Sequence, residues 1–307
     1  MSKKKVFQLG VIGLGVMGKH HARVAAHTRG LSLGAVADLD EKTAQEVGEK
    51  HGVPWFTNYH ELFPFVDAVI VASPTASHFE VGKDCLSAGK PALIEKPLAK
   101  TSEQAQRLVV LAKEKNLPLA VGLIERFNPA FVELAKLIKK EKILGLDIKR
   151  RSPFPERITD ANVIIDMMIH DLDLMLTLMG NDEIESLKVI GEKVKTTMLD
   201  KVNATVYFRT GTIAKIDADR VFGSKTRKIV VTTDKALYEA DLLSKNVYVR
   251  TLEHISPSSH FTKQYDQLTA ELMDFVLAIK RGQSPKVSAT AGLKCLQLAE
   301  EVEKACS

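Results

Sequence analysis

Residues 9–18 read Leu9-Gly10-Val11-Ile12-Gly13-Leu14-Gly15-Val16-Met17-Gly18, between a short apolar run and a segment of helical pattern. Gly13, Gly15 and Gly18 form a GxGxxG pattern at this junction of a predicted strand and a predicted helix. The first glycine permits a tight turn, the second lets the backbone approach a pyrophosphate, and the third allows close helix packing. The N–H groups at the start of the helix attract phosphate oxygens. The stretch therefore predicts a dinucleotide-binding loop of the Rossmann type.

An acidic residue at the end of the second predicted strand narrows the cofactor. Asp38 follows Gly18 by about 20 residues, the spacing at which a carboxylate accepts hydrogen bonds from the ribose hydroxyls. The carboxylate also repels a 2′-phosphate, and no arginine directly follows it. We therefore expect NAD rather than NADP, with the loop residues Leu14, Val16 and Met17 also in contact with it.

The pattern of predicted elements changes after Gly122. Before it, short β-rich runs alternate with helical patterns, which is typical of βαβ units and a parallel sheet. After it come two helices, a series of alternating strands between residues 184 and 250, and two closing helices. We predict two domains: an α/β Rossmann domain over residues 1–122 and an α+β domain with a largely antiparallel sheet over residues 123–307.

Composition limits the class of protein. The chain has 307 residues, 45% of them hydrophobic and 26% charged, with a net charge of +5. This length allows two cores, and clusters such as Lys149 to Arg151 are typical of a solvated face rather than a nucleic-acid site. The glycine loop lies inside the only apolar run that imitates a signal peptide, and three scattered cysteines fit a reducing compartment. We expect a cytoplasmic protein with neither nucleic-acid nor membrane partners.

Two polar segments follow predicted strands of the first domain. Ser73-Pro74-Thr75 with His78 follows the strand at 67–72, and Glu95-Lys96-Pro97 follows the strand at 91–95. Open parallel sheets bind ligands beyond the carboxyl ends of their strands, so both segments are expected at the cofactor. The Lys96 ammonium can hydrogen-bond a substrate oxygen and stabilise alkoxide character during hydride transfer. A plain surface lysine at a strand end remains an equal alternative.

A second polar set lies on the predicted helix at 162–179. Asp166, His170 and Asp173 fall on one stripe at spacings of four and three residues. A carboxylate one turn away can orient the imidazole, which suits His170 as a general base for a hydroxyl proton. A satisfied structural histidine remains the main alternative. We expect no metal, because no third ligand with zinc-like spacing accompanies Asp166 and His170.

Together these residues resemble the glucose-fructose oxidoreductase and inositol dehydrogenase (Gfo/Idh/MocA) family over the whole chain. The resemblance rests on the glycine pattern with His21, on Asp38, Ser73-Pro74-Thr75 with His78, Glu95-Lys96-Pro97, Arg126-Phe127-Asn128-Pro129, and the Asp166, His170 and Asp173 helix. It implies a second domain that mediates homodimers or homotetramers through its sheet. It also implies that Lys96, Asp166 and His170 contact substrate at the hydride-transfer site. One departure is Met168, where many members have glycine.

Two segments resemble the branch of this family that includes UDP-N-acetylglucosamine 3-dehydrogenase. They span residues 124–129 and 151–158. Within them Arg126, Arg151 and Arg157 could bind a substrate diphosphate through guanidinium forks, with Asn128 beside them. Ordinary ion pairing is an equal alternative for each arginine.

The resulting hypothesis is an NAD-dependent oxidoreductase that transfers hydride between nicotinamide and a hydroxyl-bearing carbon of a sugar or nucleotide sugar. Under the narrower resemblance that carbon is C3 of UDP-N-acetylglucosamine. Two alternatives stay open: a dehydrogenase of a free sugar or cyclitol, and a non-catalytic NAD-binding regulatory protein.

Overall fold

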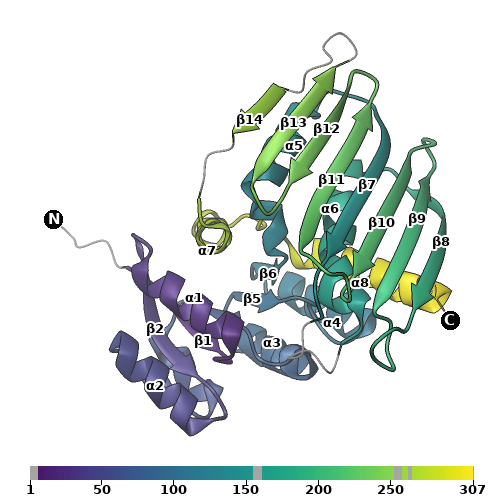
Figure 1. Ribbon diagram of the computed structural model, residues 1–307. Helices are drawn as coiled ribbons and strands as arrows, with labels where there is room; N and C mark the ends of the chain where they lie inside the picture. The colour runs from purple at the N-terminus through teal and green to yellow at the C-terminus, as the bar shows by residue number, and fades with distance from the viewer. Residues whose placement is uncertain (1–5, 155–160, 252–257, 262–264, 307) are drawn as a thin grey trace. The chain divides into compact units, whose positions relative to one another are not determined.

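The computed structural model describes residues 6–154, 161–251, 258–261 and 265–306 (Figure 1). The chain divides into two compact units. The first comprises Met1–Ile124 and Asp266–Lys294, and the second comprises Glu125–Tyr265 and Cys295–Ser307. The sequence predicted two domains with a single boundary at residue 122. The division in the structure differs, because Asp266–Lys294 belongs to the first unit.

The first unit contains a six-stranded sheet in which every described pair is parallel. The strand order is β3-β2-β1-β4-β5-β6, with the topological switch point between β1 and β4, where such sheets bind dinucleotides. The prediction of a Rossmann fold is confirmed. The strands are β1 (Phe7–Ile12), β2 (Leu31–Ala37), β3 (Trp55–Phe56), β4 (Ala68–Val71), β5 (Ala92–Glu95) and β6 (Leu119–Gly122).

Local capping explains where several helices of this unit begin. Asp40 accepts the N–H of Thr43 at the start of α2, and Thr101 accepts that of Gln104 at the start of α4. The helices are α1 (Val16–His27), α2 (Glu41–His51), α3 (His78–Ser87), α4 (Ser102–Glu114) and α7 (Gln267–Arg281), with 3₁₀ turns η1 (Tyr59–Phe65) and η2 (Thr75–Ser77).

Helix α7 completes the core of the first unit although it comes from near the end of the chain. Its buried residues Leu268, Leu272, Phe275 and Val276 recur at helical spacing and belong to the same apolar cluster as Leu9 of β1. The helix also packs against α1. The side chain of Asp266 caps its start, and Gly282 ends it in a left-handed conformation.

The second unit contains an eight-stranded sheet in the order β14-β13-β12-β11-β7-β10-β9-β8. Among its described pairs only β7 and β10 are parallel. The prediction of an α+β domain with a largely antiparallel sheet is confirmed. The strands are β7 (Ile143–Arg151), β8 (Ile184–Glu192), β9 (Lys201–Phe208), β10 (Ile213–Asp219), β11 (Thr226–Thr233), β12 (Ala236–Asp241), β13 (Asn246–Thr251) and β14 (Ser258–Phe261).

Helices cover one face of this sheet. Helix α6 contacts β7 and β10, and α5 contacts β12 and β13 (Figure 1). Along β7, Leu146 and Ile148 are buried while Asp147 and Lys149 alternate with them on the open face. The helical elements are η3 (Ile124–Phe127), α5 (Pro129–Leu137), the π-helical turn η4 (Ile164–Met168), α6 (Ile169–Met179) and α8 (Ala289–Ala305). Within the described residues, no helix is long and apolar enough to span a membrane.

Candidate functional site

The glycine loop between β1 and α1 has the geometry that a pyrophosphate needs. Gly13 has φ +85°, and a Cβ there would lie 2.4 Å from the backbone nitrogen of Ser73. At Gly18 a Cβ would lie 1.8 Å from the carbonyl oxygen of Gly13. At Gly15, by contrast, a Cβ would have no described atom within 4 Å other than those of Gly15 and its two chain neighbours. The loop is therefore closed where the chain packs on itself and open where a phosphate must approach.

The carboxylate of Asp38 lies beside this loop. Its Oδ2 accepts the backbone N–H of Leu14 at 2.6 Å, and its Oδ1 accepts that of Asp40 at 2.9 Å. Each carboxylate oxygen has a further lone pair for a ribose hydroxyl. The next side chain, Leu39, is 90% exposed. The residues of the loop and Asp38 thus fit an NAD adenosine and pyrophosphate.

His78 joins the two polar segments that follow β4 and β5. Its side chain is buried, with Nδ1 2.8 Å from the carbonyl oxygen of Pro97 and Nε2 2.8 Å from that of Ser73. The hydroxyl of Ser73 also lies 2.7 Å from that of Ser77. His78 therefore holds the segments together, while the backbone of Ser73 lies against Gly13.

Glu95 and its neighbours fix the backbone at Lys96. Glu95 Oε1 lies 2.8 Å from Nε2 of the fully buried His21, and its Oε2 accepts the Lys96 N–H at 3.2 Å. The peptide bond between Lys96 and Pro97 is cis. Lys96 is partly buried at the carboxyl end of β5, where the sequence places it. The pairing of His21 with Glu95 is a contact that the motif alone did not reveal.

Glu271 on α7 is a buried acid that sequence reasoning missed. Its side chain is 3% exposed, and neither carboxyl oxygen has a hydrogen-bond partner among the described residues. Burial, with the nearby charges of Glu95 and Asp274, raises the pKa of Glu271 well above its usual range. The amphipathic pattern of 262–280 indicated a helix, but nothing in it indicated that the helix belongs to the first unit.

In the second unit, Asp166 and His170 lie at a change of helix type. Residues Ile164–Met168 form a π turn, and Ile169 donates its N–H to the carbonyl of Ile164, five residues back. The prediction of a regular α-helix was wrong over this turn, because periodicity does not distinguish an inserted residue. Both side chains are partly buried, and single π turns recur at functional sites.

Asp173, the third polar residue of the predicted stripe, pairs with Arg126. Arg126 Nε donates to Oδ2 at 2.7 Å and Nη2 donates to Oδ1 at 2.5 Å, while Asp173 is 1% exposed. Burial raises the pKa of Asp173, and the guanidinium opposes that rise. The guanidinium of Arg126, which we considered as a ligand of a substrate diphosphate, therefore binds a carboxylate of the same chain.

Asn128 is also engaged within the fold. Its side chain is 2% exposed, and Oδ1 accepts the N–H of Ala130 at the start of α5. Its amide donates to Glu125 and to the carbonyl of Leu242, each at 3.0 Å. Asn128 is therefore a helix cap.

Arg150 and Arg151 point to opposite faces of the sheet. Arg150 is buried, donating to Asp171 at 2.9 Å and to Glu125 at 3.0 Å, so the prediction of a solvated cluster over 149–151 was wrong for Arg150. Strand alternation was the signal that could have found it. On the open face, Arg151 pairs with Asp217. Arg157 lies outside the described residues.

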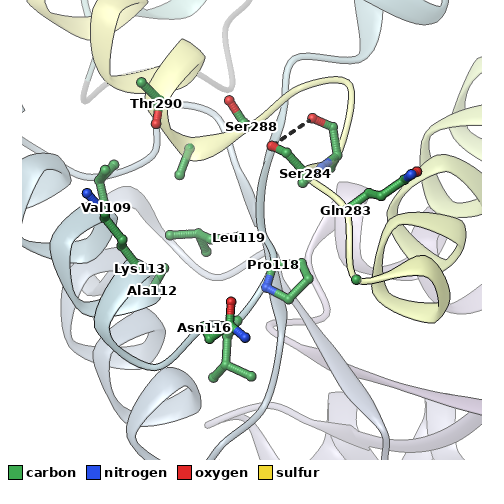
Figure 2. Close-up of a pocket in the computed structure, with 14 residues that line it drawn as sticks. Val109, Ala112, Lys113, Asn116, Pro118, Leu119, Gln283, Ser284, Ser288 and Thr290 are labelled. Atoms are coloured by element: carbon green, nitrogen blue, oxygen red, sulfur yellow. Dashed lines mark hydrogen bonds between the residues drawn. The ribbon is translucent and has the colours of Figure 1, made fainter.

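A cavity of about 390 Å³ in the first unit lies away from the glycine loop. Figure 2 shows it between the end of α4, the segment entering β6, and the connection from α7 to α8. Pro118 and Leu119 place it at the amino end of β6, whereas the glycine loop follows the carboxyl end of β1. It is therefore not the dinucleotide site. Among the described residues, no group of three or more His, Cys, Asp or Glu is arranged to hold a metal ion.

Comparisons with known proteins cover both units. The model of the Gfo/Idh/MocA oxidoreductase family with an NAD-binding Rossmann fold matches residues 7–123, and that of the family's C-terminal domain matches residues 146–239. UDP-N-acetylglucosamine 3-dehydrogenase of Acidithiobacillus ferrooxidans is 31% identical over 96% of each chain. Myo-inositol 2-dehydrogenase of Thermotoga maritima is 31% identical over 97% of this chain and 95% of its own.

Solved structures of oxidoreductases are similar to this chain over nearly its whole length. A structure of the Acidithiobacillus ferrooxidans enzyme superposes with a TM-score of 0.91 at 32% identity, covering 97% of each chain. An oxidoreductase of Agrobacterium radiobacter in complex with NAD⁺, at 17% identity, shares the fold with a TM-score of 0.88 and covers 98% of this chain and 96% of its own.

Proposed function

The chain belongs to the Gfo/Idh/MocA family of oxidoreductases, and from this premise we propose that it is an NAD-dependent dehydrogenase of a nucleotide sugar. Two of the relatives that match it over nearly its whole length are a dehydrogenase of a nucleotide sugar and a dehydrogenase of an inositol. The observation that most supports the nucleotide-sugar proposal is the match to UDP-N-acetylglucosamine 3-dehydrogenase across both units.

The preference for NAD over NADP rests on Asp38. Its carboxylate is fixed by the Leu14 and Asp40 amides, so it cannot readily turn away from a 2′-phosphate. Leu39 follows it, where an arginine would be needed to neutralise that phosphate.

The chemistry that we propose uses the cofactor and three side chains. NAD, when bound, supplies the hydride acceptor. His170 takes the proton of the substrate hydroxyl as general base, and Asp166 orients its imidazole and stabilises the imidazolium. The Lys96 ammonium donates a hydrogen bond to the same oxygen and stabilises its developing negative charge. In the reverse reduction, His170 returns the proton.

Single substitutions test these roles. We expect His170→Ala and Lys96→Ala each to lower kcat by about 10²–10⁴-fold, while both variants still bind NADH in a fluorescence titration. His60→Ala, a histidine that is half exposed in the first unit, is the control and should leave kcat unchanged. Full turnover by the His170 or Lys96 variant would refute the assignment.

The substrate class needs its own test, because a cyclitol dehydrogenase is the second candidate. The similarity to myo-inositol 2-dehydrogenase favours this candidate. The ion pairs of Arg126 with Asp173 and of Arg151 with Asp217 also favour it, because they leave both guanidinium groups less available to a diphosphate. We expect UDP-N-acetylglucosamine, and not myo-inositol, to raise the unfolding temperature of the NAD-loaded protein. Turnover on neither class would favour a non-catalytic NAD-binding protein.

We further propose that the open face of the eight-stranded sheet forms the interface of a homodimer or homotetramer. Val230 lies near its centre on β11, and the ion pairs Lys228–Glu239 and Arg151–Asp217 already satisfy charges around it. Sedimentation of Val230→Arg should show a smaller species than the unaltered protein. An unchanged mass would place the interface elsewhere. The free, scattered cysteines fit a cytoplasmic protein.

A further inference from the structure

The second unit contains a fully buried ion pair that the proposed chemistry does not use. The side chains of Arg220 and Asp200 are both 0% exposed, and Arg220 Nε donates to Asp200 Oδ1 at 2.9 Å. Their backbones are also joined, since the Arg220 N–H donates to the Asp200 carbonyl at 3.0 Å. Withdrawing two charges from water costs several kcal/mol each, so a buried pair by itself is weak evidence of added stability. The other contacts of the pair show what it holds in place.

A second donor of Arg220 reaches the segment before the helix that contains Asp166, while Nη2 donates to the hydroxyl of Thr196 at 3.2 Å. Nη1 donates to the carbonyl of Ala161 at 2.5 Å. The next residue, Asn162, accepts the N–H of Asp166 at its own carbonyl at 3.0 Å. Its side-chain Oδ1 also accepts the N–H groups of Ile164 and Ile165, at 3.0 and 3.1 Å. One bonded path therefore runs from the buried guanidinium to the backbone of Asp166.

Asp200 supports the same point from the other side. Its Oδ2 accepts three consecutive backbone N–H groups, of Val194, Lys195 and Thr196, at 2.8, 2.6 and 2.8 Å. Burial opposes ionisation, but these bonds and Arg220 hold the pKa of Asp200 well below its usual range. The loop organised in this way ends at Leu199, whose carbonyl accepts the N–H of Val163 at 2.9 Å.

This anchor matters because the segment it precedes is a π turn. A π turn is a single-turn bulge within a helix, closed by i→i+5 bonds, so the direction of a side chain on it depends on where the turn begins. Asp166 is the third residue of the π turn, and Ala161 and Val163, which the anchor holds, directly precede it.

We propose that Arg220 and Asp200 are positioning residues that fix the start of the π turn and thereby set the orientation of the Asp166 carboxylate. The inference rests on the proposed role of Asp166 in orienting His170. A shift of about 1 Å at such a group reduces turnover by about 100-fold.

The test is a double-mutant cycle between the anchor and Asp166. Arg220→Met should lower kcat by about 10- to 100-fold, leave NADH affinity unchanged, and lower the apparent pKa on the acid limb of the kcat profile, because an imidazolium without an oriented carboxylate is less stable. In an Asp166→Asn background, Arg220→Met should lower kcat no further. Arg220→Lys keeps the positive charge but lacks the branched guanidinium, so its kcat should lie between that of Arg220→Met and that of the unaltered protein.

Two further variants keep the outcome decisive. Asn162→Ala keeps the carbonyl that accepts the Asp166 N–H but removes the side-chain oxygen that accepts the Ile164 and Ile165 amides, and it leaves no buried charge. It loosens the start of the π turn in this way, so it should reproduce the loss and the non-additivity if Arg220→Met fails to fold. Lys136→Met removes an exposed ion pair on α5 of the same unit and should leave kcat and its pH profile unchanged. Equal losses of kcat in both backgrounds, or a lowered unfolding temperature with unchanged kcat, would overturn the positioning role. If Asp166→Asn alone leaves kcat unchanged, the proposed function has failed instead.

Discussion

At the scale of the residue, Asp38 combines two contacts on one carboxylate. One oxygen holds the Leu14 amide of the glycine loop and the other holds the Asp40 amide. A hydrogen bond to a charged group contributes about 1.5–3 kcal/mol. We therefore expect Asp38→Ser to weaken NADH binding by about 10- to 100-fold and to reduce the preference for NADH over NADPH, as measured by fluorescence titration.

The control for this prediction is Asp40→Ala. Asp40 caps α2 through its side chain and contributes only its backbone to the Asp38 contact. It should lower the unfolding temperature slightly while leaving cofactor affinity intact. If both variants bind NADH equally well, Asp38 does not contact the ribose.

Glu271 predicts a pH dependence of stability. Its pKa is raised in the folded state, chiefly by burial, so the folded protein retains a proton that the unfolded chain releases. The resulting stability is complete below the unfolded pKa of about 4.3 and is lost as the pH rises through the folded value. Glu271→Gln cannot titrate, so it should match the unaltered protein near that lower limit and be more stable than it at alkaline pH. Urea unfolding along a pH series measures this, and a difference that is independent of pH would contradict it.

At the scale of the element, the Arg126–Asp173 pair ties η3 to α6. Arg126→Met would leave a carboxylate that is 1% exposed without this partner, which should cost about 3–5 kcal/mol of unfolding free energy. Asp173→Leu added to it should recover much of that loss. If Arg126 instead contacts a substrate diphosphate, both variants would show a raised KM for the UDP-sugar, so unfolding and kinetics together distinguish the two roles.

The same scale shows which features the sequence could predict. Gly13, Gly18 and Asp38 lie within one βαβ unit, so their relation follows from short-range pattern, and the Rossmann fold was predictable. The partner of Arg126 is 47 residues away and that of Arg220 is 20 residues away, and no local periodicity specifies either pairing. The π turn could not be predicted from the sequence for a different reason: one inserted residue leaves the apolar pattern of the helix nearly intact.

At the scale of the whole molecule, the first unit depends on two distant parts of the chain. Leu268, Leu272, Phe275 and Val276 of α7 are buried in its core. Burial of each such side chain contributes about 1.5–3 kcal/mol, and the four together rival the 5–15 kcal/mol that stabilises a typical domain. We expect a fragment of residues 1–124 alone not to fold, and the same fragment joined to residues 266–294 by a flexible linker to fold and bind NADH.

Circular dichroism and NADH fluorescence measure this outcome. The matched control is the joined fragment with Leu272→Asp, which keeps the length and the linker but places a charge in the core. Cooperative unfolding of the 1–124 fragment by itself would show that α7 is dispensable.

The chain order of α7 also bears on synthesis at the ribosome. The glycine loop emerges before residues 125–265 of the second unit, whereas α7, which completes the core around that loop, emerges after them. Until then an apolar surface is exposed on the nascent chain, where chaperones can bind and misassembly can begin. The nucleotide-binding unit is thus begun before the second unit and completed only after most of that unit has been made.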